Sequence, residues 1–263
     1  MRVRLAPLDS VVDVTAPPEV AEPLTDLLHE ISRTGSDGLD RPTAEVRVTA
    51  DVDGYVVDDG SSPARARDLE EALELLLAVV NRTAVLQCRD FAAHAGVVAS
   101  DGTAVAFPAR SGVGKSTLVG ACLQQGWAYV SDEALVVRPS TDVRPYAKPL
   151  SLHTWSLARL GLTGPPGDRS ERAVPVSQLG HASTGPLRLT HLVVPRRATG
   201  AADLLPLPRA EGAMVLLEHS FNHFRDPAGS LHLVAGLVRA ASTWVLVYDD
   251  PVDAAVLLRR RLG

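Results

Sequence analysis

The sequence predicts an α/β protein, with a smaller α+β module over residues 1–89 and a larger α/β domain over residues 90–263. Three observations support this prediction. A short apolar strand, a glycine-rich loop and an amphipathic helix follow one another at residues 103–123. The first ~90 residues combine strand-like and helical patterns. The composition, 46% hydrophobic and 22% charged, is that of a globular chain able to bury a substantial core.

Periodicity defines the elements of the N-terminal module. Residues 44–48 alternate apolar and polar side chains as a half-buried strand does, and Asp53-Gly54 is typical of a tight turn. Apolar residues recur at helical spacing over 68–87. The predicted strands are 11–14, 44–48 and 55–57, the predicted helices are 18–32 and 68–87, and 61–67 is predicted as a loop or linker.

The larger domain begins with a hairpin around Ser100-Asp101-Gly102. Residues 161–184 are rich in Gly, Pro and Ser and are predicted to be an irregular, mobile excursion. The predicted strands are 94–99, 103–107, 127–130, 135–137, 187–194 and 243–248, and the predicted helices are 115–125, 209–219, 231–241 and 251–261.

The loop after the second strand matches the P-loop (Walker A) pattern at Gly114, Lys115 and Ser116, while Ala109 replaces its first glycine. Backbone N–H groups and the positive end of the helix dipole cradle phosphates in such a loop. Ala109 is tolerated if its φ stays negative. We therefore expect a bound nucleoside triphosphate, held by Ala109, Arg110, Ser111, Gly112, Val113, Gly114, Lys115, Ser116 and Thr117.

Two acidic residues follow the next predicted strand. Asp132 and Glu133 come only 17 residues after Lys115. A parallel strand–helix–strand unit would return the chain beside its first strand and place acids at that strand's end near the phosphates. Phosphoryl transfer needs an acid for Mg²⁺ and a base for the acceptor hydroxyl.

This order of loop, helix, strand and paired acids resembles the C-terminal catalytic domain of HPr kinase/phosphorylase, which shares the nucleotide fold of phosphoenolpyruvate carboxykinase. The resemblance covers about 90–149 and includes His94 at the start of a strand. The chain is also similar to the HPr-kinase-like proteins of peptide-tailoring gene clusters, including lasso-peptide kinases, in which a variable α+β region precedes the kinase core.

The resemblance implies an ATP- and Mg²⁺-dependent kinase acting on a hydroxyl, with a peptide or protein serine favoured over a small molecule. Asp132 would be the general base, His94 would orient it or tune its pKa, and Lys115 would stabilise the transferring phosphoryl. Ser116, Glu133 and Asp132 would hold Mg²⁺. The N-terminal module and residues 161–184 would form the acceptor site.

Some residues depart from the family pattern or stand outside it. Glu133 replaces an Asp, and the glycine-rich signature of the bifunctional enzymes is missing between Pro149 and Arg188, so action on HPr itself is not expected. Lys148 and the Arg196-Arg197 pair are candidate phosphate contacts. The segment from Glu218 to His223 fits no metal template and is interpreted as a surface helix end.

The alternative function is a nucleotide-binding regulator or an inactive kinase, which Ala109 would suit. An ABC-type ATPase is disfavoured because its signature helix is missing, and a carboxykinase because the chain is short for it. The net charge of −5 argues against broad nucleic-acid binding. The sequence shows no signal peptide and no apolar run that could span a bilayer, so we expect a cytoplasmic protein without a membrane partner. Homo-oligomerisation is left open.

Overall fold

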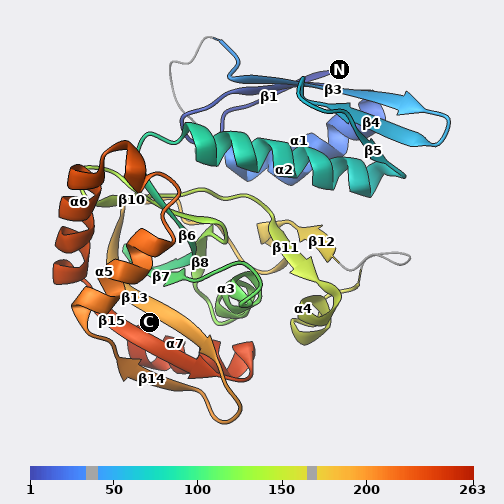
Figure 1. The fold of residues 1–263 in the computed structure, drawn as a ribbon. Helices are drawn as coiled ribbons and strands as arrows, with labels where there is room; N and C mark the ends of the chain where they lie inside the picture. Colours follow the sequence, from blue (N-terminus) through green and yellow to red (C-terminus); the bar gives the residue numbers. More distant parts are fainter. Residues whose placement is uncertain (34–40, 165–170) are drawn as a thin grey trace. The chain divides into compact units, whose positions relative to one another are not determined.

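A computed structural model describes residues 1–33, 41–164 and 171–263 of the chain. These residues form two compact units, Met1–Arg89 and Asp90–Gly263, which divide where the sequence analysis places its boundary. The fold is of the mixed α/β class (Figure 1). Among the described helices, none is long and apolar enough to cross a membrane.

In its described residues, the first unit is a five-stranded sheet with two helices. The sheet order is β1-β2-β3-β4-β5, and only β2 and β3 pair in parallel. The Asp68 side chain caps the second helix by accepting a hydrogen bond from the Glu71 N–H. The elements are β1 (Arg2–Leu5), β2 (Val12–Thr15), α1 (Pro18–Arg33), β3 (Ala44–Asp51), β4 (Gly54–Asp58), β5 (Ala64–Ala66) and α2 (Leu69–Gln87).

One prediction for this unit is wrong. Residues 61–67 were expected to be a loop or linker, but Ala64–Ala66 forms the edge strand β5 against β4. Three residues are too few to show a periodic pattern, and the strand exists because β4 offers it a free edge.

The second unit is organised around an eight-stranded mixed sheet in the order β10-β9-β6-β7-β13-β15-β14, with β8 also paired to β6. Since β10 pairs with β13 as well as β9, the strands from β10 to β13 form a closed ring. The strands are β6 (Phe91–Ser100), β7 (Thr103–Pro108), β8 (Ala128–Ser131), β9 (Ala134–Val137), β10 (Asp142–Arg144), β13 (Leu187–Arg197), β14 (Asp203–Pro206) and β15 (Ser242–Tyr248).

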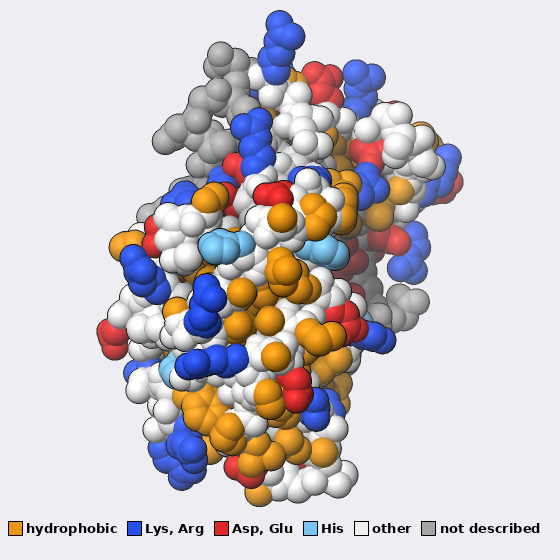
Figure 2. All heavy atoms as spheres, turned by 60° about the vertical axis from the view of Figure 1, so that its left-hand side comes forward, with side chains coloured by type: hydrophobic (Ala, Val, Ile, Leu, Met, Phe, Trp, Pro, Cys, Tyr) orange, Lys and Arg blue, Asp and Glu red, His pale blue; other side chains and the backbone are white. Residues whose placement is uncertain are grey.

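Helices cover both faces of this sheet (Figure 1). Val98, Val105 and Phe107 point into a core with α3 (Lys115–Gln124) and α7 (Pro251–Leu262). The alternate residues, such as Val97 and Ala106, point into a second core with α5 (Arg209–Glu218) and α6 (Pro227–Ala240). Figure 2 brings the α5–α6 side forward and shows hydrophobic side chains gathered on it. Exposed examples there are Met214, Phe224 and Leu231.

The sequence analysis expected the strand after α3 to return beside β7, but the structure places it elsewhere. β8 pairs antiparallel with β6, and β6 pairs antiparallel with β7, so β6 separates β8 from the strand that precedes the loop. β8 and β9 keep a common register against β6, Val97↔Ser131 and His94↔Ala134. Asp132 and Glu133 therefore interrupt one long strand instead of ending a short one.

The expected irregular excursion at 161–184 is partly regular. β11 (Leu150–His153) pairs antiparallel with β12 (Glu171–Val174), and a 3-10 turn covers Val176–Gln178. The short helix α4 (Thr154–Arg159) follows β11 directly. Residues 165–170 of the expected excursion lie outside the described part of the chain.

Candidate functional site

The glycine-rich loop connects β7 to α3 and has the backbone that its glycines permit. Gly112 and Gly114 have φ of 84° and 96°, in the left-handed region that favours glycine. Of the described non-glycine residues, only Leu8, Asp101 and Thr141 have positive φ, so Ala109 is not strained there. Gly114 is also the residue at the N-terminal cap of α3. It has no side chain to accept from the first N–H groups of the helix, which are therefore available.

Lys115 folds back over this loop. Its ammonium donates hydrogen bonds of 2.8 Å to the carbonyl oxygens of Ala109 and Arg110. The side chain is buried, and burial lowers the pKa of Lys115 to about 8 although Glu133 and Asp132 oppose the change. An ammonium held by neutral carbonyls in a buried position is suited to receive an anion.

Asp132 and Glu133 interrupt the β8–β9 strand opposite the middle of β6. The Ser131 hydroxyl accepts hydrogen bonds from the N–H groups of Glu133 (3.1 Å) and Ala134 (3.0 Å). The Glu133 carbonyl still accepts from the Ala95 N–H at 3.2 Å. A serine side chain thus takes the place of ladder hydrogen bonds and holds both carboxylates at this point.

Lys148 makes the closest contact with Asp132. Its Nζ lies 2.8 Å from Asp132 Oδ1 and 3.8 Å from Glu133 Oε2, and the Lys148 and Asp132 side chains are only 5% and 1% exposed. Burial disfavours the Lys148 ammonium, but the nearby Asp132 and Glu133 carboxylates outweigh it and raise the Lys148 pKa. The segment after β10 therefore brings a second lysine to the acids.

Tyr129 joins Asp132 to the Lys148 backbone. Its hydroxyl accepts from the Asp132 N–H at 3.0 Å, and its one proton is within reach of the Lys148 carbonyl (2.7 Å) and Asp132 Oδ1 (3.0 Å). Burial raises the Tyr129 pKa well above its usual value, so the hydroxyl stays protonated. No pattern in the sequence singles out Tyr129 from other buried aromatics.

His94 contacts Glu133 instead of Asp132. Its Nδ1 lies 2.9 Å from the Glu133 carbonyl oxygen and 3.5 Å from Glu133 Oε1. A carbonyl oxygen only accepts, so Nδ1 carries the proton and Nε2 is left as an acceptor in the neutral ring. Burial and the Lys115 charge lower the His94 pKa, which favours that neutral form.

These side chains meet in one pocket of about 260 Å³. Its lining includes most of the residues proposed from the sequence, together with Ser151, His153 and Glu171 from the paired strands β11 and β12, which sequence reasoning missed. The full lining is His94, Ser111, Gly112, Gly114, Lys115, Ser116, Thr117, Asp132, Glu133, Lys148, Ser151, His153 and Glu171.

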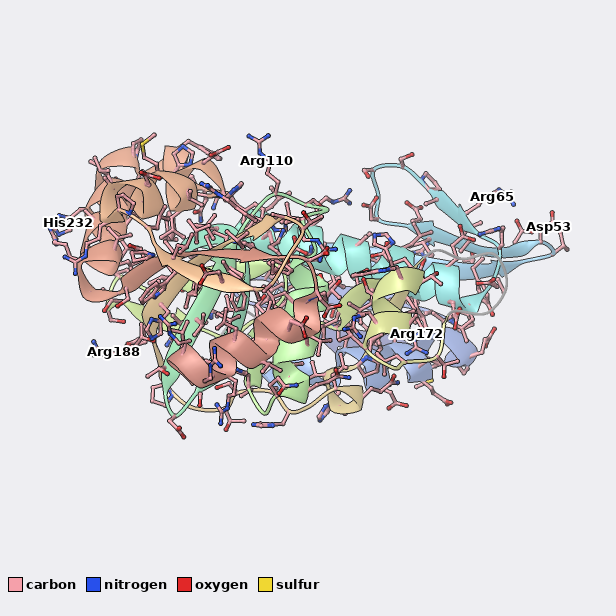
Figure 3. All side chains as sticks on the ribbon, turned by 90° about the horizontal axis from the view of Figure 1, so that it is seen from below. Asp53, Arg65, Arg110, Arg172, Arg188 and His232 are labelled. Carbon is pink, nitrogen blue, oxygen red and sulfur yellow. The ribbon has the colours of Figure 1, made fainter. Side chains whose placement is uncertain are left out.

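The remaining loop residues lie around this pocket. Ala109 is buried beneath the loop, and Arg110 extends away from the ribbon (Figure 3), where it pairs with Glu218 at 2.7 Å. Ala109, Arg110, Val113, Arg196 and Arg197 are not among the described residues that line the pocket.

The segment from Glu218 to His223 is more than a surface helix end. The His219 carbonyl accepts from the His94 N–H at 2.8 Å, and the Phe221 N–H donates to Ala92 at 2.8 Å. The Phe221 ring lies 5.7 Å from the His94 ring, edge to face. The segment therefore supports the start of β6, where His94 enters the site.

The acid pair fits a metal that is shared with a substrate. The described residues contain no group of three His, Cys, Asp or Glu side chains that could hold a metal by themselves. Mg²⁺ in phosphate-transfer sites typically takes one or two carboxylates and completes its shell with waters and substrate phosphates. Glu133, Asp132 and the Ser116 hydroxyl at one pocket meet that lesser requirement.

The chain matches no protein-family model and no curated protein.

Proposed function

We propose that this protein is an ATP- and Mg²⁺-dependent kinase that transfers the γ-phosphate to a hydroxyl group, in the manner of HPr-kinase-like enzymes. One observation carries the proposal. The chain has two lysines, Lys115 and Lys148, and both enter the pocket that contains the glycine-rich loop and the Asp132–Glu133 pair. Cations and open backbone N–H groups on one side and carboxylates on the other are what phosphoryl transfer to a hydroxyl requires.

In this proposal the loop is a P-loop and Lys115 is its phosphate-binding lysine. The Lys115 ammonium donates to two neutral carbonyl oxygens, which bind an ammonium more weakly than a charged acceptor does. A phosphate oxygen would be such a charged acceptor. The N–H groups at the start of α3 add partial positive charge at the same place. Both effects stabilise negative charge as it redistributes over the transferring phosphoryl.

Asp132 is the proposed general base. Lys148 and Tyr129 hold its carboxylate in position through an ion pair and a hydrogen bond, so that a hydroxyl brought against it can give up its proton there. His94 acts on Glu133, whose carbonyl and carboxylate it contacts, and so positions the second acid. When bound by Ser116, Glu133 and Asp132, Mg²⁺ would supply charge neutralisation for the phosphates.

The acceptor is proposed to be a serine of a peptide or protein, on the family resemblance alone, with a small-molecule hydroxyl as the other possibility. Ser151, His153 and Glu171 supply polar groups at the pocket beside the acids. Glu171 comes from the 161–184 region that the sequence analysis assigned to the acceptor. The contribution of the N-terminal unit stays a prediction.

The test separates nucleotide binding from phosphoryl transfer. We expect micromolar binding of MgATP by calorimetry, its loss in Lys115→Ala, and its retention in Asp132→Asn. Transfer from γ-labelled ATP to a panel of serine peptides and small polyols should occur with the wild type and fall ~10²–10⁴-fold in Asp132→Asn. Asp203→Asn makes the same change at an exposed carboxylate that does not line the pocket, and serves as the matched control.

Two results would contradict the kinase proposal. If the wild type binds no MgATP, the loop is not a phosphate-binding loop. If the wild type binds MgATP but transfers no phosphate to any acceptor or to water, and Asp132→Asn behaves identically, the protein is a nucleotide-binding regulator or an inactive kinase.

A further inference from the structure

Three side chains form a layered group near the glycine-rich loop but outside the pocket. The Arg197 guanidinium carbon lies 5.4 Å from the centre of the Trp155 ring and 5.2 Å from the centre of the Tyr248 ring. Arg197 ends β13 and Tyr248 ends β15, which both run parallel to β7. Their side chains therefore lie at the carboxyl ends of these parallel strands, the same end of the sheet as the loop that follows β7.

The group touches the loop through Tyr248. A Cβ built on Gly114 would lie 3.8 Å from the Tyr248 hydroxyl. This hydroxyl is buried and makes no hydrogen bond of normal geometry with the described residues. Burial raises the Tyr248 pKa, and the adjacent Arg197 opposes that rise. A buried hydroxyl and the Arg197 guanidinium beside its ring thus lie next to the loop.

Trp155 is held in place although the residue is 53% exposed. The neighbouring Ser156 hydroxyl is hydrogen-bonded to the Thr117 hydroxyl at 2.7 Å, which ties α4 to the first turn of α3. At its other end, Arg159 pairs with Asp250, just beyond β15. An exposed indole on a short helix that is fixed at both ends is a preformed flat surface.

The order of strands in the sheet places this surface on the opposite side of β7 from the acids. The acids lie against β6, on one side of β7, whereas Arg197 and Tyr248 come from β13 and β15 on the other side. A nucleotide bound with its terminal phosphoryl toward Asp132 must extend its nucleoside the opposite way. That direction leads from Gly114 past Tyr248 and Arg197 to Trp155.

We propose that Trp155, supported by Arg197 and Tyr248, is the stacking surface for the base of the nucleoside triphosphate; this rests on the proposed function. Stacking on an aromatic ring suits any base because every base has a π-face. The group contains no side-chain carboxylate or amide that would read the base edge. ATP and GTP are therefore expected to bind with similar affinity. Arg197 adds positive charge on the nucleoside side of the loop.

The test compares MgATP with magnesium tripolyphosphate, which offers the same phosphate chain without a nucleoside. Calorimetry with Trp155→Ala should show MgATP binding weakened at least about fivefold and tripolyphosphate binding unchanged. Trp155→Phe should keep most of the affinity, because it keeps a ring. Phe224→Ala removes another exposed aromatic of the same unit, 66% exposed, and should change neither affinity.

Three outcomes would overturn the base-stacking proposal. If Trp155→Ala binds MgATP as the wild type does, Trp155 does not stack on the base, while the phosphate site and the kinase proposal stand. If Trp155→Ala loses affinity for both ligands equally, its role is structural. If the wild type binds neither ligand, the proposed function fails and the stacking surface with it.

Discussion

The buried pair of Lys148 and Asp132 offers a quantitative test of how this site is built. Lys148→Met removes the ammonium and leaves the Asp132 carboxylate, 1% exposed, without its cation. At 2.8 Å the Coulomb attraction is of order 6 kcal/mol at an effective dielectric constant of about 20. Desolvation of both charges offsets much of it, but removing one partner of a buried pair typically costs about 3–5 kcal/mol. We expect a loss of that size.

A double-mutant cycle isolates the charge interaction. Asp132→Asn alone leaves the Lys148 ammonium unpaired, whereas Lys148→Met with Asp132→Asn removes both charges. The free energy of unfolding lost in the double variant should therefore be smaller than the sum of the losses in the two single variants. We expect the difference to be at least about 1.5 kcal/mol. The pair of Arg110 and Glu218, at 2.7 Å but exposed, is the control: Arg110→Ala should lower the free energy of unfolding far less than Lys148→Met does.

Urea unfolding followed by tryptophan fluorescence measures these free energies, because Trp127, Trp155 and Trp244 all belong to the second unit. The folded-state pKa of Lys148 is raised, so its contribution is complete below the ordinary lysine value and is lost only as pH rises through the raised one. The cost of Lys148→Met should thus be constant from pH 6 to 9. A loss below about 1 kcal/mol, or additive losses in the cycle, would refute this reasoning.

Three further predictions concern other positions. Gly114→Ala forces a side chain onto a φ of 96° and should lower stability by about 1–2 kcal/mol in the same urea assay, while Gly185→Ala should have little effect. Burial lowers the Lys115 pKa to about 8, so the ammonium form to which the proposed function assigns phosphate binding is lost above that pH; calorimetry should show MgATP affinity falling from pH 7 to 9.5, and a constant affinity would contradict the proposed role. In the first unit, Arg4 and then Arg2 hold the Asp13 pKa at about 2, below its ordinary value of 3.8. Its stabilising effect is present above that ordinary value and lost as pH falls through about 2. Hydrogen exchange of β2 should therefore be faster in Asp13→Asn than in the wild type at pH 6, and the two should converge near pH 2.

The local features of the chain were predictable from the sequence. The hairpin turn that ends at Gly54 and the glycines of the loop act within a few residues, so adjacent residues in the sequence determine them. The helices from 209, 227 and 251 were expected within a few residues of their observed bounds, because each carries a continuous apolar stripe. Local hydrogen bonding and periodicity determined these elements.

The tertiary structure decided how they meet. The edge strand β5 and the insertion of β6 between β8 and β7 depend on which strands find partners, and a pairing between distant residues leaves no periodic mark. The same applies to the contact of Lys148 with Asp132 and to the meeting of Trp155, Arg197 and Tyr248. The sequence alone determined that a glycine-rich loop, two lysines and an acid pair exist. Only folding, which brings residues far apart in the chain into one desolvated pocket, decided that they act on one another.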